Sequence, residues 1–226
     1  MTTTNEQDAA AEGNDDDKPN RLIVSRLIHR ARDGATPAEL AEIHRTDPVL
    51  CYALLAELGS GTAVPTGYVK TCTQAIELTG VPALIEWLEA ALEHAISFPR
   101  FSEQMRDTLI RARFMELMGR STMMRDDTED MYLVGLFSRL NRLLGIPLAE
   151  LILPLPFPEE MQAAILEQRG RIGRLLKFAQ AIESADESSI GFMQTNMHLP
   201  AVQVYDAYNE AYDWMVEVES QSTAMA

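Results

Sequence analysis

The stretch that decides the fold is GLFSRLNRLLG, residues 135–145. Its leucines and phenylalanine recur at the three- and four-residue spacing that places side chains on one face of a helix. Ser138 and Arg139 interrupt this face where a buried helix normally carries apolar side chains. The stretch therefore predicts a buried helix, from about residue 128 to 144, with a polar pair inside it. The question it raises is whether that pair marks a site that has lost its ligands.

Helical signals continue on both sides of this stretch, and no segment makes a convincing strand. Thr36 and Asp47 each precede a proline, which is typical of a helix N-cap followed by proline at the first helical position. The prolines of LILPLPFP, residues 151–158, predict an irregular connection. We therefore expect an all-α fold, with helices over residues 21–31, 36–45, 47–58, 71–78, 81–96, 101–124, 128–144, 159–168, 170–184 and 198–218.

Composition limits the classes of function. The chain has 226 residues, of which 46% are hydrophobic, enough for a sizeable core. Its formal charge of −15 argues against sequence-independent binding of nucleic acid, which depends on lysine and arginine neutralising phosphates. The chain shows no secretory signal and no apolar run of the roughly 18 residues that a membrane span needs. We expect a cytoplasmic protein that binds neither nucleic acid nor membrane.

The two ends of the chain differ in character. Residues 1–20 carry six acids and almost nothing apolar of any size, so we expect a disordered acidic tail. Near the other end, aromatic and apolar residues recur at alternating spacings of four and three. This stripe predicts a core face of the last helix rather than a ligand cage. Its members are Ala201, Tyr205, Tyr208, Tyr212 and Met215.

Tests for common catalytic patterns are negative. Cys51 and Cys72 form no CxxC motif and no Cys/His cluster in the sequence, so we expect two reduced thiols. No two histidines have the three- or four-residue spacing of a helical metal pair, and no phosphate-binding glycine loop is present. The acids of the turn at 126–130 predict a solvated connection, with a cation site as the weaker alternative; they are Asp126, Asp127, Glu129 and Asp130.

Three blocks in a specific order resemble the HDOD domain, the degenerate relative of the HD metal-dependent phosphohydrolases. The blocks are ELAEIHRTDPVLCYALLAELGSG, VKTCTQAIELTGVPALIEWL, and LIRARFMELMGR followed by YLVGLFSRLNRLLGIPLAELILPLP and EEMQAAILEQRGRIGRLL. They look most like the HDOD half of EAL-HDOD signalling proteins. The resemblance implies an HD-like multi-helix bundle over residues 21–185, with residues 186–226 as a C-terminal helical extension. No EAL-like segment accompanies it, so we expect no cyclic di-GMP chemistry from that source.

The resemblance also implies where a metal site would lie. In catalytic relatives a His-Asp pair follows the Gly-Leu-Leu helix, and here the pair falls on Ser138 and Arg139. An upstream histidine position falls near Arg111. Because arginine is cationic and cannot ligate a divalent ion, the resemblance implies no metal, no cofactor and no catalytic residues. The alternative is that Ser138 and Arg139 are only the polar edge of an amphipathic helix, which also implies no metal.

Other positions match the structural motifs of the family. They are Asp47, Pro48, Gly59, Ser60, Ala75, Ile76, Gly80 and Gly135. The family's Asn-Ser pair appears here as Gly59 and Ser60, which weakens any expectation of a ligand contact in that loop.

The expected function is that of a non-enzymatic bacterial regulatory protein that binds a signalling partner, with a homo-oligomer also possible. One candidate surface is a basic cluster, whose arginines could instead pair with the chain's many carboxylates. Two alternatives stay open: a nucleotide or small-molecule sensor that uses Arg111 and Arg139 as anion contacts, and a metal-dependent phosphohydrolase with an atypical site. The basic cluster comprises Arg111, Arg113, Arg120, Arg139 and Arg142.

Overall fold

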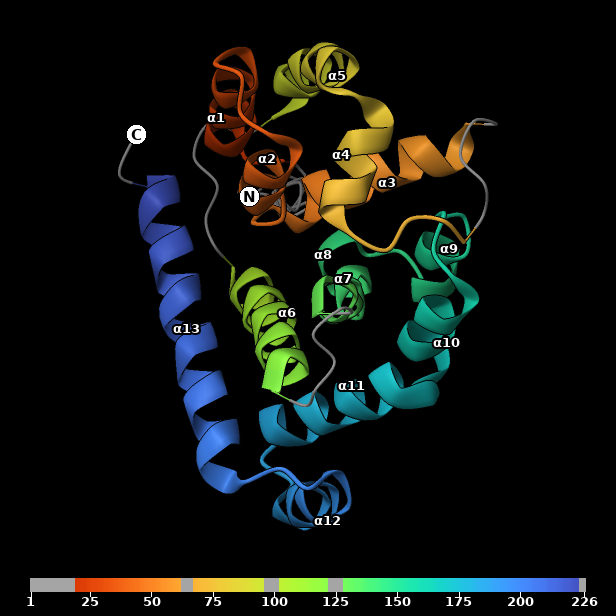
Figure 1. Ribbon diagram of the computed structural model, residues 1–226, viewed down its shortest axis with the longest axis vertical. Helices are drawn as coiled ribbons and strands as arrows, with labels where there is room; N and C mark the ends of the chain where they lie inside the picture. The colour runs from red at the N-terminus through yellow and green to blue at the C-terminus, as the bar shows by residue number, and fades with distance from the viewer. Residues whose placement is uncertain (1–18, 62–66, 96–101, 122–127, 224–226) are drawn as a thin grey trace, which may run out of the picture.

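A computed structural model describes residues 19–61, 67–95, 102–121 and 128–223, and all regular structure within them is helical (Figure 1). This confirms the all-α prediction. The helices are α1 (Arg21–Arg32), α2 (Pro37–His44), α3 (Pro48–Ser60), α4 (Cys72–Thr79), α5 (Val81–His94), α6 (Glu103–Ser121), α7 (Thr128–Phe137), α8 (Leu140–Leu144), α9 (Leu148–Ile152), α10 (Glu159–Glu167), α11 (Gly170–Glu183), α12 (Glu187–Met197) and α13 (Ala201–Thr223).

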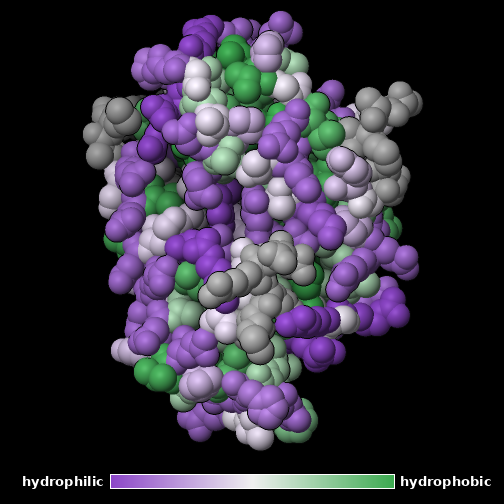
Figure 2. Space-filling view, in the orientation of Figure 1, coloured by the Kyte–Doolittle hydropathy of each residue, from purple (hydrophilic) through white to green (hydrophobic). Residues whose placement is uncertain are grey.

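Helices α6 and α7 form the centre of the bundle. They pack closely on each other, and α13 runs along the outer side of α6 (Figure 1). Helices α1–α5 lie together at one end of the molecule, whereas α10–α12 lie across the other end. Polar side chains cover most of the face shown in Figure 2. Because every side chain of α7 from Asp130 to Phe137 is buried, this helix is the core element around which the others are arranged.

The predicted helix starts at Thr36 and Asp47 are confirmed. Thr36 and Glu39 form a reciprocal capping box at the start of α2, in which each side chain accepts a bond from the other residue's backbone N–H. The Asp47 side chain accepts bonds from the backbone N–H groups of Val49 and Leu50 at 3.0 Å each. These caps fix the turn between α2 and α3, which carries several buried polar groups.

The predicted single helix over 128–144 is wrong, because the structure ends α7 at Phe137 and begins α8 at Leu140. The break falls on Ser138 and Arg139. The Ser138 hydroxyl donates to the carbonyl of Gly135 at 2.7 Å, and Arg139 leaves the helical conformation with φ −117° and ψ 4°. Helices α9 and α12 were not predicted. The polar pair therefore redirects the chain at the centre of the molecule.

The aromatic stripe predicted as the core face of the last helix is largely wrong. Met215 is buried, but Tyr205 and Tyr212 are 67% and 50% exposed. The buried face of α13 is instead built from small and aliphatic residues at spacings of three and four, which pack towards α6; they are Val204, Ala207, Ala211, Met215 and Val218. The large aromatic side chains misled the sequence reasoning because close packing on α6 selects small residues.

The ends of the predicted domains can be placed only in part. Residues 1–18 of the predicted tail lie outside the described residues. Asn20, which was assigned to the tail, is buried and caps α1 through its side chain. In the C-terminal extension, α12 packs on α11 and α13 on α6, so the described part of this segment covers the bundle.

Gly135 allows α6 and α7 to approach each other closely. A Cβ atom at this position would lie 2.7 Å from Cα of Ala112 and 3.1 Å from the carbonyl oxygen of Arg111, both backbone atoms of α6. Gly135→Ala is therefore expected to force the helices apart and to lower the free energy of unfolding by about 1–3 kcal/mol. Urea denaturation followed by circular dichroism measures the change.

The matched control is Gly191→Ala in α12, where an added Cβ meets nothing within 4 Å. Since alanine is the better helix former, this variant is expected to be unchanged or up to about 1 kcal/mol more stable. Equal effects of the two substitutions would contradict the close-packing explanation.

Candidate functional site

The residues at the implied metal position do come together. Arg111 of α6 donates from Nη1 to the Ser138 hydroxyl at 3.0 Å and from Nε to Oε1 of Glu183 at 2.6 Å. Arg139 donates from Nη1 to Oε2 of Glu183 at 3.0 Å and from Nη2 to Oδ2 of Asp107 at 2.8 Å. We call these five residues the Glu183 network. It ties α6, the α7–α8 junction and the end of α11 to one another.

The Glu183 network leaves little freedom for another ligand. The side chains of Arg111 and Arg139 are only 7% and 9% exposed, and Glu183 at 24% is the shared acceptor of both. Bidentate contacts between a guanidinium and a carboxylate are among the stronger charged hydrogen bonds. The arrangement is chemically a charge-compensated clamp, and it presents no histidine or free carboxylate to a metal ion.

Two other arginines of the basic cluster belong to a different network. Arg113 and Arg120 donate to Glu116 at 2.9 and 2.7 Å, and Arg45 from the α2–α3 turn binds the same carboxylate. We call this group the Glu116 network. The guanidinium of Arg45 also stacks on the Tyr132 ring at 3.6 Å from its centroid. Arg142 is exposed on α8, so only this member of the cluster lies on the open surface without a described ion pair.

The Glu116 network makes stability depend on pH. Burial alone would raise the pKa of Glu116, but the guanidinium groups of Arg45 and Arg113 outweigh it and bring the pKa below its ordinary value of 4.5. Because the pKa of Glu116 is lower in the folded than in the unfolded chain, ionised Glu116 stabilises the fold at any pH above the pKa of the unfolded chain. This contribution is lost as the pH falls through the pKa of the folded chain. Urea unfolding from about pH 7 to about pH 3 is expected to show acid destabilisation that is weaker in Glu116→Gln. Identical pH dependence in both proteins would contradict this assignment.

The structural motif positions occupy turns and close contacts. Asp47 is buried and also accepts a bond from the backbone N–H of Asn20 at 2.6 Å. At Gly59 an added Cβ would lie 2.4 Å from the carbonyl oxygen of Pro154, so glycine permits the contact between α3 and the segment after α9. Gly80 has φ +76° between α4 and α5. Pro48, Ala75 and Ile76 are buried, whereas Ser60 is exposed at the end of α3.

The acidic turn is only partly described. Asp126 and Asp127 lie outside the described residues. Glu129 and Asp130 belong to the first turn of α7, and Asp130 is buried, which corrects the prediction of a solvated surface connection for these two residues. The Glu129 carboxylate accepts bonds from the backbone N–H and hydroxyl of Thr73, both at 3.3 Å.

A buried group that sequence reasoning missed joins the α2–α3 turn to α4. Sγ of Cys51 lies 3.3 Å from Nδ1 of His44 and 3.5 Å from Sγ of Cys72. The expectation that neither cysteine belongs to a Cys/His cluster is therefore wrong. Hydrogen bonding to Cys51 and to His44 lowers the pKa of Cys72, whereas burial and Cys72 raise the pKa of Cys51. No local spacing signals this group, because Cys72 meets the other two only through tertiary packing.

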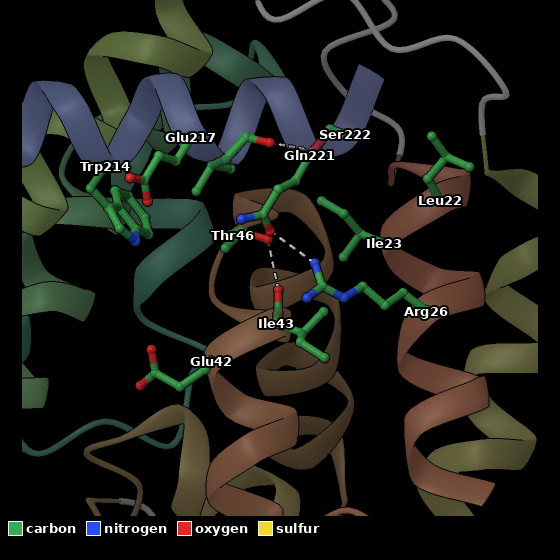
Figure 3. Close-up of a pocket in the computed structure, with 11 residues that line it drawn as sticks. Leu22, Ile23, Arg26, Glu42, Ile43, Thr46, Trp214, Glu217, Gln221 and Ser222 are labelled. Carbon is green, nitrogen blue, oxygen red and sulfur yellow. Dashed lines mark hydrogen bonds between the residues drawn. The ribbon is translucent and has the colours of Figure 1, made fainter. Parts of the chain in front are cut away.

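A separate pocket lies between α1, α2 and α13 (Figure 3). Its cavity volume is about 160 Å³, with Ile23, Ile43 and Trp214 among its apolar lining. Arg26 donates to the side chain of Gln221 across it at 3.0 Å. This hydrogen bond links α1 to α13 across the pocket.

No helix among residues 19–61, 67–95, 102–121 and 128–223 combines the length and apolar character needed to cross a bilayer.

Comparison with known proteins gives two sequence relatives. The chain is 26% identical over 172 residues to the cyclic di-GMP phosphodiesterase CdgJ of Vibrio cholerae, covering 76% of this chain and 40% of CdgJ. It is 26% identical over 183 residues to the protein YuxH of Bacillus subtilis, covering 77% of this chain and 43% of YuxH. The chain therefore spans less than half the length of either relative. No protein-family model matches it.

Solved structures support the fold. The crystal structure of the MmoQ response regulator from Methylococcus capsulatus superposes with a TM-score of 0.62 at 16% identity, covering 90% of this chain and 97% of that one. A second crystal structure of MmoQ, of fragment 20–298, gives a TM-score of 0.58, also at 16% identity, with 86% and 90% coverage. Together with the three sequence blocks and the helical bundle, these matches identify the chain as a homologue of CdgJ and YuxH with an HDOD-type domain.

Proposed function

We propose that this chain is a non-enzymatic signalling domain that acts by binding another protein. The observation that carries the proposal is the Glu183 network. Arg111, Ser138 and Arg139 stand where the HDOD resemblance implies that catalytic relatives place metal ligands; Arg111 bonds to Ser138, and both arginines bond to Glu183. The position is occupied by protein charges rather than left open for a cation.

Electrostatics support a non-catalytic role. A unit charge at 4 Å from another of the same sign costs about 4 kcal/mol at the effective dielectric of a protein surface. A divalent ion beside Arg111 and Arg139 would meet two such charges, both nearly buried. Glu183 offsets part of this cost but is already bonded to both guanidinium groups. These residues favour a domain that has exchanged metal binding for internal ion pairs.

The relatives support a role in signalling. CdgJ is named as a cyclic di-GMP phosphodiesterase and MmoQ as a response regulator. The matched region is 40% of CdgJ. We propose that this chain shares the regulatory part of such a protein and not its hydrolytic activity.

The basic cluster is a poor candidate for the binding surface, because four of its five members are engaged in the two ion-pair networks. A better candidate is the outer face of α13, which is opposite to the face packed on α6. Large apolar side chains recur there at helical spacing, and we call them the α13 outer face: Val202, Tyr205, Tyr212 and Val216, which are 66%, 67%, 50% and 41% exposed.

The proposal is tested by affinity capture from source cells with the tagged chain. The wild type is compared with a Tyr205→Glu, Tyr212→Glu double variant and with a Tyr68→Glu, Leu153→Glu control, which alters exposed apolar residues elsewhere. We expect a specific protein to be retained by wild type and control and lost by the α13 variant. Sedimentation of the purified chain shows whether a second copy is the partner. Equal capture by all three proteins would contradict the assignment of this surface.

The sensor alternative requires an anion to displace Glu183 and Asp107 from the two arginines. Under the proposed function, cyclic di-GMP and other nucleotides are expected to leave the melting temperature unchanged in a thermal-shift assay. A saturable shift that is lost in Arg139→Gln would favour the sensor instead.

A further inference from the structure

Three side chains of ligand type meet in the core at a distance from the Glu183 network. They are His44 at the end of α2, Cys51 in α3 and Cys72 at the start of α4, and they are 1%, 0% and 2% exposed. We call them the His-Cys-Cys group. One nitrogen and both sulfur atoms lie within 4.8 Å of one another. Full burial is notable for histidine, whereas free cysteine is among the residues most often found buried.

We infer that the His-Cys-Cys group is a metal site for a soft divalent ion of the zinc class. Zinc binds thiolate at about 2.3 Å and imidazole nitrogen at about 2.0–2.1 Å. Ligand atoms around a tetrahedral ion are then about 3.5–3.8 Å apart. Sγ of Cys51 lies 3.3 Å from Nδ1 of His44 and 3.5 Å from Sγ of Cys72. Both distances are within a few tenths of an ångström of those expected between zinc ligands.

The polar atoms of the group bond mainly to one another. Nε2 of His44 is buried and has no hydrogen-bond partner among the described residues. Apart from the His44 ring and the Cys72 thiol, the described partner of the Cys51 thiol is the His44 carbonyl, at 3.4 Å. His44 therefore faces the Cys51 thiol with Nδ1, the nitrogen that would bind the ion.

Charge balance favours a divalent ion. Two thiolates and a neutral imidazole around a divalent cation have no net charge, which suits a site with almost no solvent contact. Arg45 favours the thiolate forms of both cysteines, but burial outweighs it at Cys51 and raises the pKa of that thiol. The charge of Arg45 is balanced by Glu116 at the other side of the α2–α3 turn.

Glu129 is not part of this group, because among the described residues only His44, Cys51 and Cys72 bring their ligand atoms within 4.8 Å of one another. Its carboxylate bonds to Thr73, the residue after Cys72, through two long contacts of 3.3 Å. The ion would therefore join α2, α3 and α4 and act as a structural clamp at this end of the bundle.

The test uses the full chain, reduced, freed of metal by chelation and handled without oxygen. Two thiols per chain are first confirmed with a thiol reagent. Co²⁺ is then added to the native protein and, in parallel, during refolding from urea. We expect one Co²⁺ per chain, with the near-ultraviolet thiolate-to-cobalt absorption and the strong visible bands of tetrahedral cobalt, both abolished by one equivalent of Zn²⁺.

Loss of a residue that only supports a metal ligand weakens metal binding by about 10- to 100-fold. His44→Gln and Cys72→Ser remove ligands themselves, so both are expected to weaken Co²⁺ binding by more than this. His29→Gln is the matched control, because His29 is exposed on α1 and contacts only Asp33 in a described ion pair. If a variant fails to fold, the cobalt spectrum of the wild type still decides, since the charge-transfer band reports thiolate ligation directly. No binding by either route, binding without that band, or closure of a Cys51–Cys72 disulfide under mild oxidation with Zn²⁺ present would overturn the inference.

Discussion

Glu116→Gln is expected to lower the free energy of unfolding by about 3–5 kcal/mol, because it removes the buried partner of Arg45 and leaves only the exposed Glu42 to balance that charge. The Glu116 side chain is 2% exposed and that of its partner Arg45 is 4% exposed. Arg45 cannot turn to water, since its guanidinium stacks on the buried Tyr132 ring, whose hydroxyl donates to the Arg45 carbonyl at 2.8 Å. The loss is measured by urea denaturation at neutral pH.

Glu42→Gln is the matched control for Glu116→Gln. Glu42 also accepts a bond from Arg45, at 3.2 Å, but its own side chain is 70% exposed. A surface ion pair of this kind contributes about 0–1 kcal/mol, so the control is expected to stay close to wild type. Comparable losses in both variants would show that the effect does not arise from burial of the Arg45–Glu116 pair.

Glu183→Gln is expected to cost about 3 kcal/mol, because two nearly buried guanidinium groups lose their shared charged acceptor. Arg111 would still donate to the Ser138 hydroxyl and Arg139 to Asp107, so the helices remain connected. The two guanidinium charges, however, are no longer balanced. The measurement is again the free energy of unfolding, followed together with the near-ultraviolet signal of the aromatic core.

Asp107→Asn is the control for Glu183→Gln. Asp107 pairs with Arg139 alone and is 42% exposed, so its loss is expected to cost under about 1 kcal/mol. If Asp107→Asn were the more damaging variant, Glu183 would not be the centre of the network. The control also separates the general loss of a negative charge from the loss of the shared acceptor.

Much of the fold was predictable because its signals are local. The caps at Thr36 and Asp47 and the prolines that follow them specify helix starts through contacts within a few residues. The break at Ser138 and Arg139 was not predictable in the same way, because the apolar spacing continues across it. It depends on the tertiary contacts that Arg111 and Glu183 make with these residues.

The candidate site was predictable only where a resemblance supplied positions. That resemblance placed Arg111 beside Ser138 and Arg139, and these residues do meet, although their role as an interaction surface stays a prediction. Glu183 was not foreseen, because the Glu183–Arg111 contact spans 72 positions of sequence. The contact between Cys51 and Cys72 was not foreseen for the same reason. The two residues are 21 positions apart, and only the packing of α3 on α4 brings them together.

The proposed non-enzymatic function is tested most directly by an assay of metal-dependent phosphodiester hydrolysis. The purified chain is incubated with Mn²⁺ or Mg²⁺ and either cyclic di-GMP or a chromogenic phosphodiester, beside the heat-denatured chain and Ser138→Ala. The native chain, the denatured chain and the variant are expected to give the same background rate. Metal-dependent turnover by the native chain that Ser138→Ala abolishes would place a working catalytic centre at the Glu183 network and contradict the proposed function.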